Sequence, residues 1–155
     1  MTILFAYDGS ESADAAIAAS ARFLRRDDRD AVVLTVWEPL IVEALRAMRF
    51  GGSVPPVPPN VAEVDDSAEA QAEQLAEHGA RLAGEAGFEA RALWVADERR
   101  IADAIVERAK ELDADLIVTG TRGLTGVSAL LGSVSSHVVQ QARRPVLVVT
   151  RDGEA

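Results

Sequence analysis

The sequence predicts an α/β fold: a single open, parallel, five-stranded sheet with helices on both faces. Five short apolar segments, most of them rich in β-branched residues, alternate with segments whose apolar residues recur every three or four positions. This β-α-β rhythm is typical of a parallel sheet, because parallel strands need long crossover connections. The chain has 155 residues, of which 48% are hydrophobic, enough for one core. We therefore expect one domain over residues 1–150 and a loose tail over 151–155.

The first predicted strand covers Thr2–Tyr7 and ends at the turn sequence Asp8-Gly9-Ser10. Ser10 is a suitable N-cap, and the apolar spacing from Ser12 to Leu24 predicts an amphipathic helix. The segment Ala31–Trp37 is almost continuously apolar, which predicts a second strand covered on both faces.

The stretch Leu40–Asp66 is the least regular part of the sequence. Gly51-Gly52 and two proline pairs, Pro55-Pro56 and Pro58-Pro59, exclude a continuous helix across it. We expect a long connection, with one or two helical turns over Ile41–Phe50.

The remainder of the chain alternates again between helices and strands, and Gly87 stands where a helix C-cap is expected. The predicted elements are a helix at Ser67–Ala86, a strand at Phe88–Val95, a helix at Glu98–Leu112, a strand at Asp115–Thr119, a helix at Ser133–Ala142 and a strand at Pro145–Thr150.

Charge and composition exclude several classes of function. The net charge of −9 opposes binding to nucleic acid or to anionic lipid. The absence of cysteine excludes disulfides, thiolate nucleophiles and cysteine metal sites. No run approaches the roughly 18 apolar residues that span a bilayer, and the N-terminus has no basic segment followed by an apolar one. We expect a soluble protein, cytoplasmic by default, with no nucleic-acid or membrane partner.

The segment from Gly120 to Ser135 carries the chemistry. It places four glycines and several hydroxyl groups between a predicted strand and a predicted helix. Glycines let backbone N–H groups approach an anion, and the N-terminus of the following helix favours negative charge. Ser133 and Ser135 add hydroxyl donors, and Arg122 adds a positive charge. The pattern predicts a phosphate site; the alternative is that the glycines only make a turn and Ser133 is only an N-cap.

The strand ends provide a second indication of a site. In open parallel sheets, ligands bind beyond the carboxyl ends of the strands, where the direction of winding reverses. Asp8, Val36 and Thr119-Gly120 all lie near predicted strand ends. These residues are therefore candidates independently of any motif.

The Gly-rich segment resembles the nucleotide-binding motif of universal stress proteins, in which Gly, two residues, Gly, nine residues, Gly and Ser or Thr bind ATP. Ile3–Ser10 resembles the opening strand of that family, and Arg144–Val149 resembles its closing strand. The resemblance implies a Rossmann-like fold, similar to that of the adenine nucleotide alpha hydrolases. It also implies ATP, together with magnesium, as the ligand.

Carried over position by position, the resemblance implies three groups of binding residues. They are Ala6, Tyr7 and Asp8 beside the adenine and ribose, Val36 on the base with Thr119 and Gly120 under the ribose, and Gly123, Gly132, Ser133, Val134 and Ser135 around the phosphates. Asp8 is also a candidate to help hold the magnesium ion, or simply the start of a turn.

This sequence departs from the family pattern twice. Eight residues separate Gly123 from Gly132 where the ATP-binding pattern has nine. The turn at Val95-Ala96-Asp97 also lacks the glycine often found after the third strand of the family.

The family resemblance further implies a homodimer formed through the last strand, residues 145–150. The apolar run Val146–Val149 agrees with this, because an open apolar edge strand invites uncontrolled pairing and is normally covered.

The resemblance implies an ATP-binding universal stress protein that acts as a nucleotide-dependent stress or signalling module. The sequence has no Gly-x-x-x-x-Gly-Lys-Ser/Thr loop and no Gly-x-Ser-x-Gly elbow, and its single lysine lies outside the Gly-rich segment. We expect at most slow ATP hydrolysis. The alternative is a dimeric interaction protein of the same fold that does not bind nucleotide. The shortened Gly-rich segment would explain the loss of binding. A third alternative is a nucleotidyl-transferring or redox enzyme, which is disfavoured because the expected catalytic groups are missing.

Overall fold

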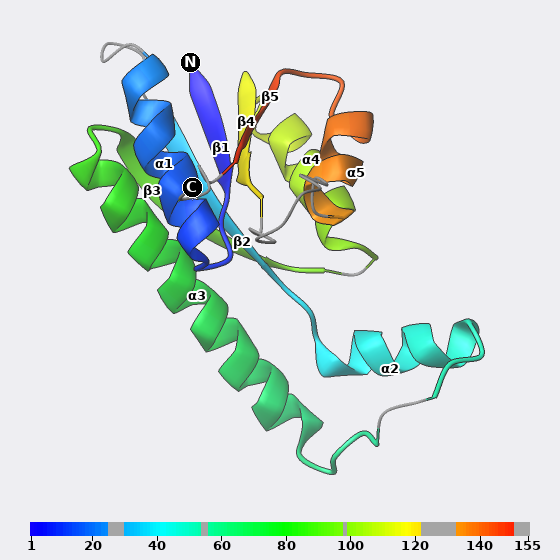
Figure 1. The fold of residues 1–155 in the computed structure, drawn as a ribbon. Coiled ribbons are helices and arrows are strands. Elements are labelled where there is room, and N and C mark those ends of the chain that lie inside the picture. The colour runs from blue at the N-terminus through cyan, green and yellow to red at the C-terminus, as the bar shows by residue number, and fades with distance from the viewer. Residues whose placement is uncertain (25–29, 54–55, 98, 122–132, 151–155) are drawn as a thin grey trace, which may run out of the picture.

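The computed structural model describes residues 1–24, 30–53, 56–97, 99–121 and 133–150, and five parallel strands form its sheet in the order β3-β2-β1-β4-β5 (Figure 1). The strands are β1 (Thr2–Ala6), β2 (Asp30–Trp37), β3 (Glu89–Ala96), β4 (Leu116–Gly120) and β5 (Val146–Val149). The helices are α1 (Glu11–Phe23), α2 (Leu40–Arg49), α3 (Val61–Glu85), α4 (Ile101–Glu111) and α5 (Ser133–Gln141). The predicted α/β class is confirmed.

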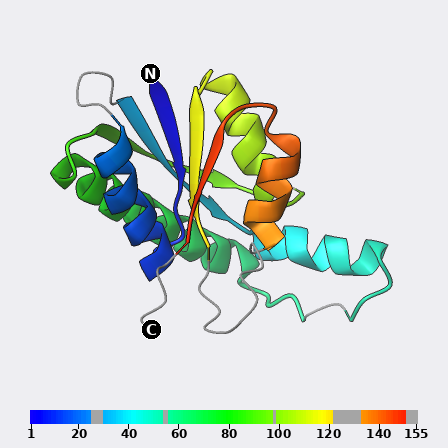
Figure 2. The ribbon, with the colours of Figure 1, turned by 45° about the horizontal axis from the view of Figure 1, so that its top comes forward.

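Two helical layers cover the two faces of the sheet, as Figure 2 shows. Side chains alternate between faces along a strand, so Ile3 and Phe5 of β1 join a core with α1 and α3, whereas Leu4 joins a second core with α4 and α5. These three residues are at most 1% exposed. Burial on both faces explains why the strands are recognisable as apolar runs in the sequence.

The stretch Leu40–Asp66 is more helical than the sequence predicts. Residues Leu40–Arg49 form the complete helix α2, and α3 begins at Val61 and not at Ser67. The second proline pair lies in the turn just before α3, where the N–H of Val61 donates to the carbonyl oxygen of Pro58, so the prolines do not interrupt the helix. The remaining predicted elements are confirmed, with ends that differ by at most three residues.

Polar contacts hold α2 in place beyond the carboxyl end of β2 (Figure 1). The guanidinium of Arg46 lies 3.1 Å from a carboxylate oxygen of Glu38 and 3.4 Å from one of Asp97. The backbone N–H of Leu40 donates to the carboxylate of Asp65 in α3 at 2.8 Å. A helix of ten residues is only marginally stable in isolation, so α2 depends on these contacts. Because the contacting residues lie outside the helix, the local sequence pattern does not predict its full extent.

No helix within the described part of the chain is both long and apolar enough to cross a membrane.

Two glycines of α3 provide a test of how this helix packs. A Cβ on Gly79 would come within 2.7 Å of Val33 and 2.8 Å of the Tyr7 ring, whereas a Cβ on Gly84 would meet no atom within 4 Å. Gly79→Ala should therefore lower the free energy of unfolding by about 1 to 3 kcal/mol through overpacking. Gly84→Ala, the matched control, should raise it by up to about 1 kcal/mol through helix propensity. Urea denaturation of both variants measures these changes, and equal effects would contradict the packing described for α3.

Candidate functional site

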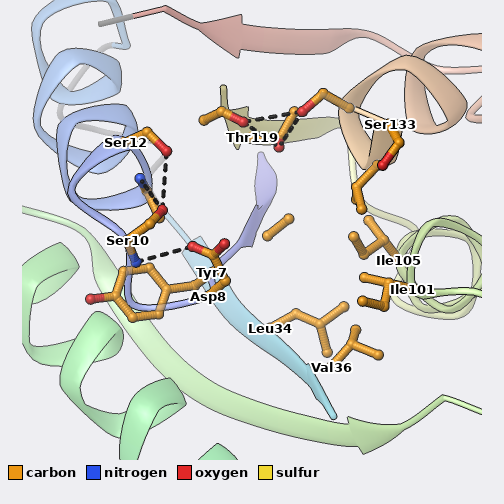
Figure 3. Close-up of a pocket in the computed structure, with 15 residues that line it drawn as sticks. Tyr7, Asp8, Ser10, Ser12, Leu34, Val36, Ile101, Ile105, Thr119 and Ser133 are labelled. Atoms are coloured by element: carbon orange, nitrogen blue, oxygen red, sulfur yellow. Dashed lines mark hydrogen bonds between the residues drawn. The ribbon is translucent and has the colours of Figure 1, made fainter. Parts of the chain in front are cut away.

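A cavity of about 350 Å³ opens at the carboxyl ends of β1, β2 and β4 (Figure 3). It lies where β1 separates β2 on one side from β4 on the other, which is the point where the winding of the chain reverses. The lining residues are Ala6, Tyr7, Asp8, Ser10, Ser12, Ala13, Leu34, Val36, Ile101, Ile105, Thr119, Gly120, Ser133, Val134 and Ser135.

The N-terminus of α1 forms one polar side of the cavity. Ser10 caps this helix, and its hydroxyl oxygen accepts a hydrogen bond from the N–H of Ala13 at 3.3 Å. The hydroxyls of Ser10 and Ser12 lie 3.0 Å apart. A carboxylate oxygen of Asp8 accepts a hydrogen bond from the N–H of Ser10 at 3.0 Å. Gly9 has a φ of 75°, so the turn between β1 and α1 requires a conformation that favours glycine.

The N-terminus of α5 forms a second polar side. The hydroxyl of Ser135 donates to the carbonyl oxygen of Gly120 at 3.1 Å and lies 3.2 Å from the hydroxyl oxygen of Thr119. Ser135 and Thr119 are both buried, whereas Ser133, at the first position of α5, is exposed. These bonds join the first turn of α5 to the end of β4.

An apolar wall faces the polar side that α1 provides. It consists of Leu34 and Val36 from β2 with Ile101 and Ile105 from α4, and Figure 3 shows Ser10 and Ser12 opposite the two isoleucines. A flat, weakly polar ring can pack on such a wall, while hydroxyls and helix N-termini are suited to an anionic group. The cavity therefore has the two halves that a nucleotide requires.

The described part of the structure brings nine of the predicted site residues to this cavity. They are Ala6, Tyr7, Asp8, Val36, Thr119, Gly120, Ser133, Val134 and Ser135. Arg122, Gly123 and Gly132 lie outside the described residues.

Tyr7 lines the cavity, but its side chain belongs to the core on the other face of the sheet. Its ring is 3% exposed and packs with α1 and α3, and in Figure 3 it points away from Leu34 and Val36. Its hydroxyl donates to a carboxylate oxygen of Asp14 at 2.7 Å. The strand alternation that directs Leu34 and Val36 toward the cavity is the same rule that turns Tyr7 away.

Six lining residues were not among the predicted ones. They are Ser10, Ser12, Ala13, Leu34, Ile101 and Ile105. Ile101 and Ile105 repeat at helical spacing, which indicates an apolar face but does not distinguish a core from a cavity wall. The sequence indicates Ser10 only as a helix N-cap. Its position two residues before Ser12 is the one sequence feature that could have indicated a pair of hydroxyls in the cavity.

Gly120 is required by the packing of α1 against β4. A Cβ at this position would lie 2.6 Å from the carbonyl carbon of Ser12 and 3.0 Å from the backbone nitrogen of Ala13. These are backbone atoms, so a side-chain rotation cannot relieve the overlap. The closeness of the β4 end to the first turn of α1 therefore depends on glycine.

The sequence profile of the Universal stress protein family matches residues 1–150. Among curated proteins, a universal stress protein of Thermus aquaticus is 35% identical over 157 residues, which cover 96% of this chain and 97% of that protein. One of Mycolicibacterium smegmatis is 34% identical over 155 residues, covering 96% of this chain but only 45% of the relative, so the chain spans about half of that protein. The chain belongs to the universal stress protein family.

Solved structures share the fold. UspA of Lactobacillus plantarum has a TM-score of 0.70 at 22% identity, covering 96% of this chain and 97% of that one. A universal stress protein in complex with cAMP has a TM-score of 0.64 at 22% identity, covering 97% and 96%. An Arabidopsis thaliana family protein with AMP bound has a TM-score of 0.64 at 19% identity, covering 99% and 94%. Some members of the family thus bind adenine nucleotides.

Tyr7 is the only tyrosine of the chain, so its titration can be followed by the absorbance of tyrosinate. Burial raises the pKa of its hydroxyl well above the usual range, and the hydrogen bond to Asp14 and the charges of Asp14 and Asp8 raise it further. The folded protein thus holds this proton more tightly than the unfolded chain. The resulting stabilisation should be fully present below about pH 10 and be lost as the pH rises through the raised pKa.

A spectrophotometric titration should show no tyrosinate in the folded protein near pH 10, where urea-unfolded protein is half ionised. Tyr7→Phe removes the titrating group, so the stability difference between wild type and variant should shrink above about pH 10. Ionisation of the folded protein near pH 10 would show that the Tyr7 hydroxyl is not buried against Asp14.

Proposed function

We propose that this chain is an ATP-binding universal stress protein that acts as a nucleotide-dependent stress or signalling module. The observation that carries the proposal is the cavity at the reversal of winding, with an apolar wall opposite hydroxyls and two helix N-termini. The AMP and cAMP complexes of structurally similar proteins support an adenine nucleotide as the ligand class.

In this proposal the base lies on the apolar wall and the phosphates lie toward α5. Val36 and Ile105 provide the packing surface for adenine, and the first-turn N–H groups of α5 with Ser133 favour the phosphate charge. The ribose would lie beside Thr119 and Gly120, which also line the cavity. The cavity volume of about 350 Å³ falls within the usual range for small-molecule sites.

Magnesium would be held largely by the nucleotide itself. Asp8 is the one carboxylate among the described residues of the lining, and no cluster of three or more His, Cys, Asp or Glu side chains suited to a metal occurs in the described segments. Oxygen ligands from phosphate and water together with one carboxylate are a typical set for magnesium. We therefore propose that magnesium accompanies ATP and does not bind by itself.

We expect hydrolysis of bound ATP to be slow. The described lining contains no histidine, lysine or arginine, and His137, the histidine of α5, has its Nδ1 atom 2.8 Å from the carbonyl oxygen of Ser133. Asp8 is the only described lining group that could act as a base, and its carboxylate accepts the bond from Ser10. A module that changes its partner affinity with bound nucleotide fits this set of groups better than an enzyme does.

A dimeric interaction protein that does not bind nucleotide is the second candidate function. The outward face of α2 favours it: Ile41, Leu45 and Met48 are 43%, 58% and 62% exposed, and Phe50 is 80% exposed. Large apolar side chains gathered on a surface often mark an interaction site. Calorimetry of the nucleotide-free protein with ATP and magnesium, AMP and cAMP separates the two candidates, because micromolar binding supports the first and no binding supports the second.

Ile101→Asp should abolish or strongly weaken nucleotide binding and leave the protein folded. An aspartate in the first turn of α4 suits the helix dipole, but here it places a charge in the apolar wall on which the base would lie. We expect a loss of at least tenfold in ATP affinity, or about 1.4 kcal/mol. Ile41→Asp, in the first turn of α2 and outside the lining, is the matched control and should bind like wild type. Unchanged affinity of Ile101→Asp by calorimetry would reject this cavity as the nucleotide site.

We also propose a homodimer formed through β5. This strand is an edge of the sheet, and its four apolar residues are only half-buried in the isolated chain. An edge of this kind is normally covered. A twofold contact between two β5 strands would cover both.

Val148→Lys should convert the dimer into a monomer, because a charged side chain on an edge strand opposes pairing. Val148 belongs to neither apolar core, so the fold should tolerate the change. Val64→Lys, at a partly exposed residue of α3, is the control and should leave the dimer intact. Sedimentation equilibrium at micromolar concentration measures both masses, and a monomeric wild type would reject the proposal.

A further inference from the structure

We infer that Asp97 is a positioning residue that connects the apolar wall of the cavity to helix α2, so that a nucleotide bound on the wall also holds α2 in place. Neither Asp97 nor its α2 partner Arg46 is among the described residues that line the cavity. The inference rests on the proposed nucleotide function and adds a way in which occupancy of the cavity affects the outer surface of the protein.

The backbone of Asp97 is tied to the end of β2. This residue follows β3, and its N–H donates to the carbonyl oxygen of Trp37 at 2.7 Å. Trp37 is the last residue of β2 and comes directly after Val36, which belongs to the apolar wall. The position of Asp97 is therefore fixed relative to the β2 side of the wall.

One carboxylate oxygen of Asp97 shapes the turn into α4. Its Oδ1 atom accepts a hydrogen bond from the backbone N–H of Arg99 at 2.7 Å, as the side chain of an aspartate in a turn commonly does. Helix α4 begins two residues later at Ile101, and its N-cap residue, Arg100, provides no side-chain cap. Because Ile101 belongs to the apolar wall, the Asp97 carboxylate positions the α4 side of the wall.

The other carboxylate oxygen of Asp97 faces α2. The guanidinium of Arg46 lies 3.4 Å from this Oδ2 atom and 3.1 Å from a carboxylate oxygen of Glu38. The Asp97 side chain is 1% exposed, whereas that of Glu38 is 45% exposed. A buried charge requires a partner, while a surface pair contributes little to stability. Moving Arg46 away therefore costs more at Asp97 than at Glu38.

These contacts make the apolar wall and α2 depend on each other. When α2 detaches, the buried carboxylate of Asp97 loses its cation and is stabilised by turning toward water, which breaks its bond to Arg99 and releases the turn before Ile101. A base packed on Val36 and Ile101 opposes that rearrangement, so it binds the attached state of α2 more tightly. This coupling is reciprocal: the ligand stabilises the attached helix by the same factor by which the attached helix strengthens ligand binding.

The test measures amide hydrogen exchange of nucleotide-free protein by mass spectrometry, with and without saturating AMP, in wild type and Arg46→Gln. In wild type, AMP should slow exchange about fivefold in α2 as well as in the first turns of α4, which is the lower end of typical coupling between sites. In Arg46→Gln, AMP should still slow exchange in α4 but no longer in α2. Calorimetry should show AMP and adenosine weakened alike, by about fivefold, because the wall holds the base and not the phosphate.

Arg49→Gln is the matched control, since it makes the same change of charge at an exposed position of the same helix. It should keep both the AMP affinity of wild type and the slowing in α2. Asp97→Asn retains an oxygen for the N–H of Arg99 but removes the charge that attracts Arg46, so it should behave like Arg46→Gln. The double variant should bind AMP about as weakly as the weaker single variant, because both changes break one contact.

Unchanged exchange in α2 of wild type, with exchange in α4 slowed by AMP, would overturn the inference and leave the proposed function standing. Slowing in α2 that persists in Arg46→Gln, or losses of affinity that multiply in the double variant, would overturn it too. If AMP changes exchange nowhere in wild type, the proposed function itself fails, and this inference fails with it. Thermal melting verifies that each variant is folded.

Discussion

The reversal of winding beside β1 is the constraint on which the rest of the structure depends. The chain leaves β1 through α1 on one face and builds β2 and β3 outward, then crosses back to place β4 and β5 on the other side of β1 with α4 and α5 on the opposite face. Crossover connections of fixed hand require the helices to change face when the direction changes. A crevice must then remain at the carboxyl ends of β1 and β4, and the cavity occupies it.

The chemistry of the cavity follows from this arrangement. Alternation along β2 directs Leu34 and Val36 toward α4, so this side of the cavity is apolar. The N-termini of α1 and α5 lie on the polar side. The first turn of α1 can approach β4 closely only because Gly120 has no side chain. The buried hydroxyl of Ser135 joins α5 to the same strand end through the carbonyl oxygen of Gly120. Stability of the sheet and shape of the site therefore depend on the same strand end.

The strands and the place of the cavity at their carboxyl ends could be predicted from the sequence, because both have local signals. Apolar runs mark strands buried on both faces, and Val36 and Thr119 were identified by their positions at strand ends. The extent of α2 was not predictable, because Arg46 contacts Asp97, a residue distant in the sequence. Nor could helical spacing alone show that Ile105, a member of the second core, also lines the cavity. The resemblance to the family named Ser135 as a site residue, but its hydrogen bond to the carbonyl oxygen of Gly120 has no signal in the sequence.

The central claim is that the cavity between the apolar wall and the two helix N-termini binds an adenine nucleotide. Its most direct test is an amide NMR titration of isotope-labelled, nucleotide-free protein with AMP. The account predicts saturable shifts concentrated at the ends of β1, β2 and β4 and in the first turns of α1, α4 and α5, with Ala6, Val36, Gly120 and Ser133 among the strongest. Shifts confined to α2 and α3, or none at millimolar AMP, would contradict it.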